Sequence, residues 1–259
     1  MELKDILYFD TETTGVTERS AKWDEDFNDY PHIVQLSWIF GCKVENHIIR
    51  PEGWEIPEEA TKIHGITTEY AIEHGVPFAL VVDMFVTDCL EAGLICAHNI
   101  HFDTSIIKAN ILRELGWVYY NLNEVERALY KGKRLDTMRS SMKWVDARTS
   151  SGRLKFPSLT ELYSRCFPGK TFEAHNALED TKAVAECLPI LVEKGLVELK
   201  VKEYDENPEK KEENARNAPN SLPISEDDKI LTEEQKTSCR AKLAKITSNW
   251  AKLLDADDF

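Results

Sequence analysis

Hydrophobic residues gather into short segments separated by polar turns, and the shortest of these segments have the composition of buried strands. β-Branched and aromatic residues dominate them, which favours strands over helices at lengths of about 4–8 residues. The predicted strands are residues 6–9, 33–40, 44–50, 94–97 and 135–137. The second and third are joined at Gly41, and we expect them to form an antiparallel hairpin that extends the sheet of the first strand.

Between and after these strands, apolar residues recur at the three- and four-residue spacing of amphipathic helices. This spacing predicts helices over residues 77–91, 103–115 and 176–192, and a first-turn proline, a polar turn and a capping serine predict three more over residues 57–62, 138–145 and 157–163. Strands that alternate with helices are typical of the α/β class, so the pattern predicts a sheet with helices packed against it.

The composition divides the chain at about residue 200. With 259 residues and 42% hydrophobic composition, the chain is long enough for one sizeable core, which we assign to residues 1–199. Residues 200–230 are charged and have almost no core-forming side chains, which is typical of a flexible linker. Residues 231–259 carry one apolar stripe, which predicts an amphipathic helix followed by an acidic tip. The stripe is expected either to pack within the protein or to bind a replication or repair protein, and both interpretations stay open.

The formal net charge of −14 excludes one class of nucleic-acid-binding protein. Binding along duplex DNA by counterion release needs clustered Lys and Arg, and this chain has 32 of them against 46 Asp and Glu. A single strand that enters a metal-containing pocket is compatible with this balance. The six cysteines form no C-x-x-C pair, the N-terminus does not resemble a signal peptide, and no apolar run reaches the ~18 residues of a membrane span. We therefore expect reduced thiols and a cytoplasmic location.

Residues 17–30 form an acidic, irregular stretch that contains Trp23 and Phe27. Segments of this kind usually lie on the surface, so the first interpretation is a solvated loop held down by the two aromatic side chains. The alternative is a flap that touches the substrate. The sequence alone leaves both interpretations open.

The candidate chemistry begins at the end of the first strand. Asp10 and Glu12 are two residues apart, so strand geometry places both carboxylates on the same side. Like charges at this separation destabilise the fold unless a cation lies between them. The pair therefore predicts part of a metal site, provided that further carboxylates arrive from elsewhere in the chain.

Four more residues have both a structural and a functional interpretation. Asp103 follows a strand and opens a helix, where an acid often serves as a cap or pairs with the helix dipole. His175 and Asp180 lie at the start of a later helix, where capping and surface roles are equally ordinary. His64 precedes a glycine between two isoleucines, so a turn role and a ligand-facing role are both open.

Taken together, three separated motifs resemble those of the DEDDh, or DnaQ-like, family of 3′-to-5′ exonucleases. The segments at residues 63–67 and 135–137 also resemble segments of that family, and the resemblance covers about residues 1–195. It implies a ribonuclease-H-like fold, in which helices flank a mixed five-stranded sheet and the site lies at the rim of the first strand. The motifs are Phe9-Asp10-Thr11-Glu12-Thr13-Thr14-Gly15, His98-Asn99-Ile100-His101-Phe102-Asp103 and His175-Asn176-Ala177-Leu178-Glu179-Asp180.

The resemblance also implies roles for individual residues. Asp10, Glu12, Asp103 and Asp180 would hold two Mg²⁺ or Mn²⁺ ions, and this oxygen-rich set argues against zinc. His175 would be the general base that takes a proton from the attacking water. Stacking and backbone contacts tolerate any base, so we expect little sequence specificity. The residues expected to hold the terminal nucleotide are Thr11, through its backbone, and Thr13, His64, Asn99 and Phe102.

The expected function is that of a metal-dependent 3′-to-5′ exonuclease. It would release nucleoside monophosphates from single-stranded or frayed DNA ends in proofreading, repair or DNA turnover. The form of the first motif resembles proofreading exonucleases more than the oligoribonuclease branch of the family. Two alternatives stay open: an exonuclease of the same family that degrades RNA from its 3′ end, and a catalytically silent adaptor that binds nucleic acid and acts through its C-terminal helix.

Overall fold

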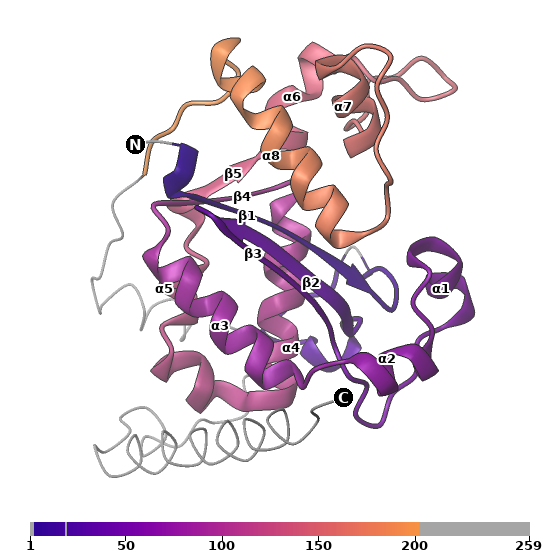
Figure 1. Ribbon diagram of the computed structural model, residues 1–259, viewed down its shortest axis with the longest axis vertical. Coiled ribbons are helices and arrows are strands. Elements are labelled where there is room, and N and C mark those ends of the chain that lie inside the picture. Colours follow the sequence, from indigo (N-terminus) through magenta and orange to yellow (C-terminus); the bar gives the residue numbers. More distant parts are fainter. Residues whose placement is uncertain (1–2, 19, 202–259) are drawn as a thin grey trace.

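One mixed sheet of five strands lies at the centre of the domain (Figure 1). The computed structural model describes residues 3–18 and 20–201, so the predicted C-terminal helix and almost all of the predicted linker lie outside the described residues. β1 is antiparallel to β2 and β2 to β3, whereas β4 is parallel to both β1 and β5. This confirms the predicted mixed sheet. The strands are β1 (Ile6–Thr13), β2 (Ile33–Phe40), β3 (Lys43–Ile48), β4 (Leu94–Ala97) and β5 (Arg134–Asp136), in the spatial order β3-β2-β1-β4-β5.

Helices of the described chain cover both faces of this sheet (Figure 1). They are α1 (Glu58–His64), α2 (Thr68–His74), α3 (Phe78–Glu91), α4 (Ile100–Leu122), α5 (Val125–Ala128), α6 (Thr137–Val145), α7 (Leu159–Cys166) and α8 (Ala177–Glu193), with short 3₁₀ helices at Leu3–Asp5, Phe27–Asp29 and Lys131–Lys133. α3, α4 and α5 share one hydrophobic core with the sheet, and α6, α7 and α8 share a second core on the opposite face. α1 and α2 pack in a smaller cluster near one end of β2.

Side chains of β1 alternate between these two cores. Leu7 and Phe9 enter the core beneath α3 and α4, whereas Ile6 and Tyr8 enter the core beneath α8. All four are at most 6% exposed, which explains why this strand is an unbroken apolar run in the sequence. The same alternation continues along β1, so that Asp10 and Glu12 project toward the α8 face and Thr11 toward the α4 face.

β1 extends beyond one of its two neighbours. Its pairing with β4 covers only Ile6 to Tyr8, whereas its pairing with β2 continues to Thr13. The carboxyl half of β1 therefore has an open flank beside the start of α4. The predicted strand ended at Phe9 because the residues after it are polar, and these polar residues are the ones that lie at the open flank.

The structure corrects two predicted boundaries in the region of α4. This helix begins at Ile100 rather than at Asp103, so Asp103 lies in its first turn and Asn99 is the residue that precedes the helix. The helix also continues past the predicted end at Leu115, with a break at Gly116, whose φ is 74°. The sequence did not predict α2 or α5, because helices of seven and four residues show little apolar periodicity; α1 is as short as α2, but Pro57 marks its start.

Residues 17–30 pack against α4. Arg113 donates to the backbone carbonyls of Phe27 and Tyr30, at 3.3 and 2.7 Å. Trp23 stacks on Tyr120 with the ring centroids 5.7 Å apart. None of the described residues of this stretch lines the pocket that contains the candidate catalytic residues. The contacts favour the interpretation of a surface loop held down by its aromatic residues over that of a flap.

Candidate active site

A pocket of about 300 Å³ opens at the carboxyl half of β1, between the N-terminal ends of α4, α7 and α8. Each of these helices contributes residues of its first turn, or of the segment just before it, to the same place. The pocket is lined by Asp10, Thr11, Glu12, His98, Phe102, Asp103, Ser158, Leu159, Thr160, Ala174, His175 and Asp180. The four predicted carboxylates and the predicted general base therefore lie in one pocket.

Three of the carboxylates form a group that could hold a metal ion. One oxygen of each of Asp10, Glu12 and Asp180 lies within 4.8 Å of the others. Asp180 is fixed by the backbone N–H of His175, which donates to its Oδ2 at 3.0 Å. Asp103 reaches the pocket from the α4 face and accepts a hydrogen bond from Thr11 Oγ1 at 2.8 Å. The alternation along β1 thus brings Thr11 to Asp103 and the two acids of β1 to Asp180.

The electrostatics of the pocket follow from this crowding. Burial raises the pKa of Glu12 to about 8, and the charges of Asp180 and Asp103 add to the shift. Burial and the three neighbouring acids raise the pKa of Asp10 well above its usual range. Burial raises the pKa of Asp103 to about 7, against the hydrogen bond from Thr11, and that of Asp180 to about 6, against the N–H of His175. Each shift shows that the folded protein alone does not stabilise the charged form.

Asn99 and His175 have left-handed backbone conformations, with φ of 72° and 67°. Asn99 directly precedes α4, which carries Asp103, and His175 lies two residues before the start of α8, which carries Asp180. Non-glycine residues adopt this conformation at a cost, and such residues concentrate at functional sites. These two residues lie just before the first helical turns that bring Asp103 and Asp180 into the pocket.

The five predicted substrate-binding residues divide into two groups. Thr11 and Phe102 line the pocket, whereas Thr13, His64 and Asn99 do not. Thr13 Oγ1 donates to the carbonyl of Gly15 at 2.6 Å, inside the turn that follows β1.

His64 has a structural contact of its own. Its Nδ1 accepts a hydrogen bond from the backbone N–H of Ile66 at 3.1 Å, which is the turn role considered from the sequence. Burial lowers the pKa of His64, and the backbone of Thr13 opposes this shift. The Nε2 atom is buried and has no hydrogen-bond partner of normal geometry among the described residues. His64 therefore lies beside the end of β1, where the backbone of Thr13 interacts with its ring.

Sequence reasoning assigned no role to several residues that line the pocket. His98 is the most firmly held of them, because Nδ1 lies 3.0 Å from Thr137 Oγ1 and Nε2 lies 3.0 Å from the carbonyl of Pro157. A carbonyl only accepts, so Nε2 carries the proton and Thr137 donates to Nδ1 in the neutral ring. Burial lowers the pKa of His98 and favours this neutral form. His98 thereby ties the segment before α7, which includes Ser158, to the ends of β4 and β5.

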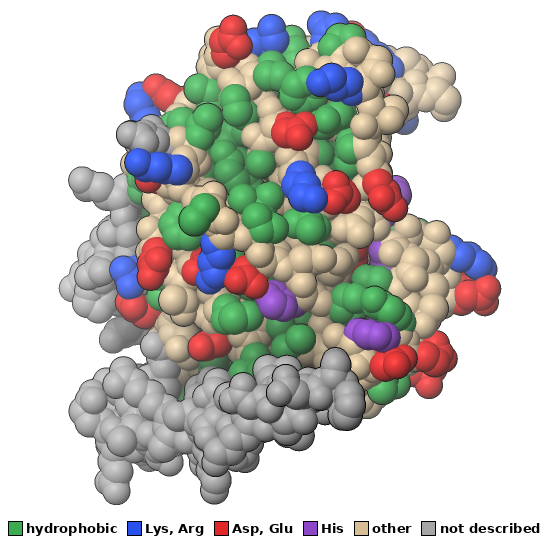
Figure 2. Space-filling model, viewed as in Figure 1, with side chains coloured by type: hydrophobic (Ala, Val, Ile, Leu, Met, Phe, Trp, Pro, Cys, Tyr) green, Lys and Arg blue, Asp and Glu red, His purple; other side chains and the backbone are tan. Residues whose placement is uncertain are grey.

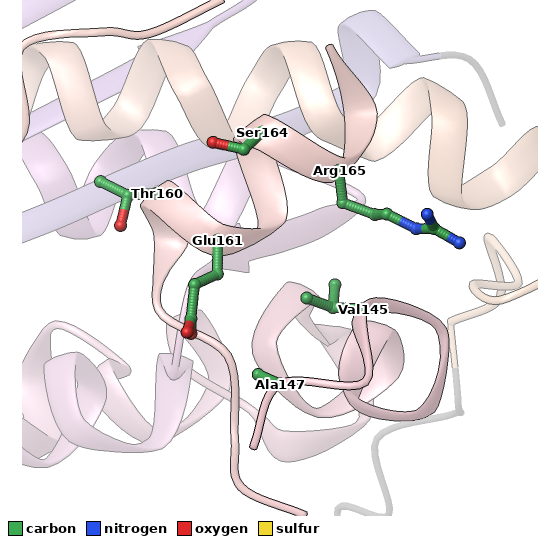
Figure 3. Close-up of a pocket in the computed structure, with 6 residues that line it drawn as sticks. All are labelled: Val145, Ala147, Thr160, Glu161, Ser164 and Arg165. Carbon is green, nitrogen blue, oxygen red and sulfur yellow. The ribbon is translucent and has the colours of Figure 1, made fainter. Parts of the chain in front are cut away.

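A larger hollow, of about 470 Å³, lies between the end of α6 and α7 and shares Thr160 with the pocket (Figure 3). Its one acid, Glu161, is engaged in the capping box of α7 and in an ion pair with Lys155. Figure 3 shows Arg165 extending away from Glu161. This hollow therefore lacks a set of groups that could act together on a ligand. Its lining residues are Val145, Ala147, Thr160, Glu161, Ser164 and Arg165.

The donor set of the smaller pocket fits hard divalent cations. Carboxylate oxygens are the preferred protein ligands of Mg²⁺ and Mn²⁺, and no cysteine lies among the pocket residues. None of the four acids forms an ion pair with Lys or Arg within the described part of the chain. Asp10, Glu12 and Asp180 are the residues that could hold such an ion directly, with Asp103 beside them.

Comparison with known proteins finds the same fold in exonucleases. No family model and no curated protein matches the sequence. Exonuclease I of Methylocaldum szegediense is 21% identical with a TM-score of 0.53, and the match covers 73% of this chain and 40% of that one. E. coli exonuclease I, in complex with a dT13 oligonucleotide, is 18% identical with a TM-score of 0.55, over 72% of this chain and 40% of that one.

A third similar structure is matched over nearly the whole of its own length. The nuclease domain of 3′hExo, a DEDDh family member bound to rAMP, is 14% identical with a TM-score of 0.52, over 77% of this chain and 96% of that one. The chain thus spans about 40% of the length of the exonuclease I chains and nearly all of the 3′hExo nuclease domain. The mixed sheet flanked by helices is the α/β fold that these exonucleases share.

Proposed function

We propose that this protein is a metal-dependent 3′-to-5′ exonuclease that releases nucleoside monophosphates from single-stranded or frayed DNA ends. One observation carries the proposal. Four acids from β1, α4 and α8 converge in a pocket and form no ion pair with Lys or Arg among the described residues. Such an arrangement costs stability unless cations enter it, and perturbed acids of this kind concentrate at catalytic sites.

The four acids would share the binding of two divalent cations. One oxygen of each of Asp10, Glu12 and Asp180 lies within 4.8 Å of the others. Asp103 accepts a hydrogen bond from Thr11 and lies close enough to Asp10 to raise the pKa of Asp10. When bound, the cations supply charge neutralisation at the phosphate and a water molecule of lowered pKa. The protein contributes the fixed positions of these oxygens, through the N–H of His175 on Asp180 and the hydroxyl of Thr11 on Asp103.

His175 is proposed as the general base. It lines the pocket and lies close enough to Asp180 to lower the pKa of that acid. An imidazole has a pKa near neutrality, which suits it to accept a proton from water during hydrolysis. The left-handed backbone at His175 sets the direction from which its side chain leaves the start of α8.

The terminal nucleotide is proposed to lie between β1 and the first turn of α4. Thr11 and Phe102 face this space directly. Thr13 and His64 lie beside it at the end of β1, and Asn99 lies where α4 begins. These contacts would involve the backbone of the substrate and one face of its terminal base, and every base has such a face. The proposed enzyme therefore accepts any base.

A DNA substrate is favoured over RNA. The E. coli exonuclease I structures contain dA16 and dT13 oligonucleotides, whereas 3′hExo is bound to rAMP, which keeps the RNA exonuclease as the second candidate. On the described part of the face in Figure 2, Lys and Arg side chains alternate with Asp and Glu instead of forming one broad basic area. A surface of this kind favours a single strand whose end enters the pocket over a long duplex track.

The remaining proposals concern the whole chain. We propose that residues 1–199 are the exonuclease domain, that residues 200–230 link it to the 231–259 helix, and that this helix binds a replication or repair protein. We also propose a cytoplasmic location. Among the described residues, no helix has the length and apolar character needed to cross a bilayer.

A silent adaptor is disfavoured, because it gains nothing from four crowded acids that cost folding stability.

The test is hydrolysis of single-stranded DNA labelled at its 5′ end or at its 3′ end. The proposal expects a 3′ label to be released at once as a mononucleotide and a 5′ label to shorten stepwise, with no reaction in EDTA and recovery with Mg²⁺ or Mn²⁺. Matched single-stranded RNA measures the preference for DNA. Internal cutting, 5′-directed release or turnover in EDTA would overturn the proposal, and absence of turnover with every metal would favour the adaptor.

A further inference from the structure

An exposed aromatic side chain and an exposed cation lie together near the rim of the pocket. Phe156 is 45% exposed, and the guanidinium carbon of Arg139 lies 5.2 Å from the centroid of its ring. The side chain of Arg139 is itself 57% exposed. Phe156 is two residues before Ser158, which lines the pocket, so the pair lies beside the pocket.

Contacts to the elements of the site hold this pair in place. The residue after Phe156 is Pro157, whose carbonyl accepts the hydrogen bond from His98. Arg139 lies in the first turn of α6, with Nε 3.3 Å from Asp136 Oδ2. The other oxygen of Asp136 accepts from the backbone N–H of Asn99 at 3.2 Å. The aromatic ring and the guanidinium are therefore fixed relative to the beginning of α4, where the pocket residues Phe102 and Asp103 are found.

The charge of this rim differs from that of the chain as a whole. Arg134 is committed to the carbonyl of Leu129 at 2.9 Å, whereas Arg139 has its guanidinium over the ring of Phe156 and 57% of its side chain exposed. In a chain of net charge −14, an exposed cation beside the pocket favours an anionic ligand.

We propose that Phe156 and Arg139 bind the part of a nucleic-acid strand that leaves the pocket, beginning with the nucleotide on the 5′ side of the one removed. This inference rests on the proposed exonuclease function. The pocket, at about 300 Å³, is at the small end of the range for small-molecule sites, so the rest of a strand must lie outside it. The base stacks on Phe156, and Arg139 contacts the phosphate through its planar fork.

Binding of a 5′-fluorescein-labelled oligo(dT) strand tests the proposal directly. It is measured by anisotropy in the Asp10→Asn background with Mg²⁺, so that the probe is not degraded. Phe156→Ala is expected to weaken binding at least about 5-fold, the lower bound for loss of one stacked base, and Phe156→Trp to restore it. Arg139→Gln is expected to reduce the slope of log K against log salt concentration by about 0.7, the value for one single-strand phosphate contact.

A matched control pair is available elsewhere in the molecule. Arg165 lies 5.2 Å from the ring of Trp144, the same separation as in the rim pair, but it borders the other hollow. Arg165→Gln is therefore expected to leave the affinity and the salt slope unchanged. An equal effect of Arg165→Gln and Arg139→Gln would overturn the proposal, because it would show a general loss of positive charge.

Hydrolysis of a small ester separates failure of this proposal from failure of the proposed function. Thymidine 5′-(4-nitrophenyl phosphate) offers the terminal nucleotide without a preceding strand. Phe156→Ala is expected to lower the ratio of kcat/KM on oligo(dT) to kcat/KM on the ester at least about 5-fold, through KM of the strand. If the wild type hydrolyses neither substrate, the exonuclease function is wrong. If it hydrolyses both and the ratio is unchanged, the rim site is wrong and the function stands.

Discussion

Two groups of buried carboxylates in this protein have similar burial and opposite surroundings. Asp88 on α3 is 6% exposed and accepts hydrogen bonds from Trp38 Nε1 at 2.6 Å and from Lys43 Nζ at 2.8 Å. Asp103 and Asp180 are 3% and 8% exposed, yet neither forms an ion pair with Lys or Arg among the described residues. A buried charge needs a partner, so the first acid supports the fold and the others are available to a ligand.

Among the described residues, the fold places a cation beside Asp88 but no Lys or Arg in an ion pair with the acids of the pocket. Asp88 joins β2, β3 and α3, of which β2 and α3 carry core residues, and a fixed cation there strengthens the packing. The acids of the pocket come from β1, α4 and α8, and they receive only a hydroxyl and a backbone N–H. Substitutions that remove one acid from each group should therefore act in opposite ways.

The largest expected effect is on hydrolysis. Asp10→Asn keeps the shape of the side chain and removes one charge that would hold the cations. We expect the rate of nucleotide release to fall at least about 10³-fold, the upper value for loss of one electrostatic contact to a transition state. Asp88→Asn is the matched control and keeps the rate, since its carboxylate lies outside the pocket. Single-turnover release of labelled mononucleotide measures both, and a similar fall in the two variants would erase the comparison.

A smaller loss is expected from the histidine beside the acids. His175→Ala should lower kcat by roughly 10²–10⁴-fold, the usual contribution of a positioned general base. The control is His74→Ala, because His74 lies at the end of α2, stacked on Tyr70 and away from the pocket. The deciding measurement is kcat with saturating Mg²⁺ or Mn²⁺ in both variants, which should fall in His175→Ala and stay in His74→Ala. An unchanged kcat in His175→Ala would exclude the base role.

Much of this site could be predicted from the sequence because its residues lie in short local patterns. The spacing of Asp10 and Glu12 on a strand, and of His175 and Asp180 at a helix start, fixes their relation without knowledge of the fold. The sheet was predictable for the same reason, since each strand is an apolar run of ordinary length. What the sequence could not give was the extent of β1, because its carboxyl half is polar and its pairing with β2 depends on tertiary contacts.

The missed residues depend on contacts between distant segments. His98 acts on Pro157 and Thr137, which are 59 and 39 positions away, and no local pattern marks such a link. The rim pair of Arg139 and Phe156 is likewise formed by α6 and the segment before α7. Phe156 follows a polar segment of the sequence, but neither its exposure nor its contact with Arg139 can be inferred without the fold.

The contrast between the two groups should also appear in the stability of the metal-free protein. Asp88→Ala leaves the buried indole N–H of Trp38 without its acceptor, and we expect the free energy of unfolding to fall by about 1–3 kcal/mol. Asp10→Asn should instead raise it, on the order of 1 kcal/mol, because one of several repelling charges is lost. Urea unfolding in EDTA measures both variants. Destabilisation by Asp10→Asn would show that the cluster is stabilised without a ligand.

The smallest expected effect is a dependence of stability on pH that bound metal reverses. The pKa of Glu12 is about 8, that of Asp103 about 7 and that of Asp180 about 6, all above the values of roughly 4 in an unfolded chain. The folded state therefore holds protons that the unfolded state has released, so this contribution is complete below about pH 4 and is lost as the pH rises toward 8.

In EDTA the free energy of unfolding should accordingly decline between about pH 5 and 8, as Glu12, Asp103 and Asp180 release their protons in the folded state. Mg²⁺ or Mn²⁺ binds the ionised acids of the folded protein, so the stabilisation that it adds should grow over the same interval. Asp10→Asn should flatten both trends, whereas Asp88→Asn should leave the slope as in the wild type. If the metal raised the free energy of unfolding equally at pH 5 and pH 8, the ions would be bound by exposed acids instead. The contrast between the two groups of carboxylates would then rest on Asp88 alone.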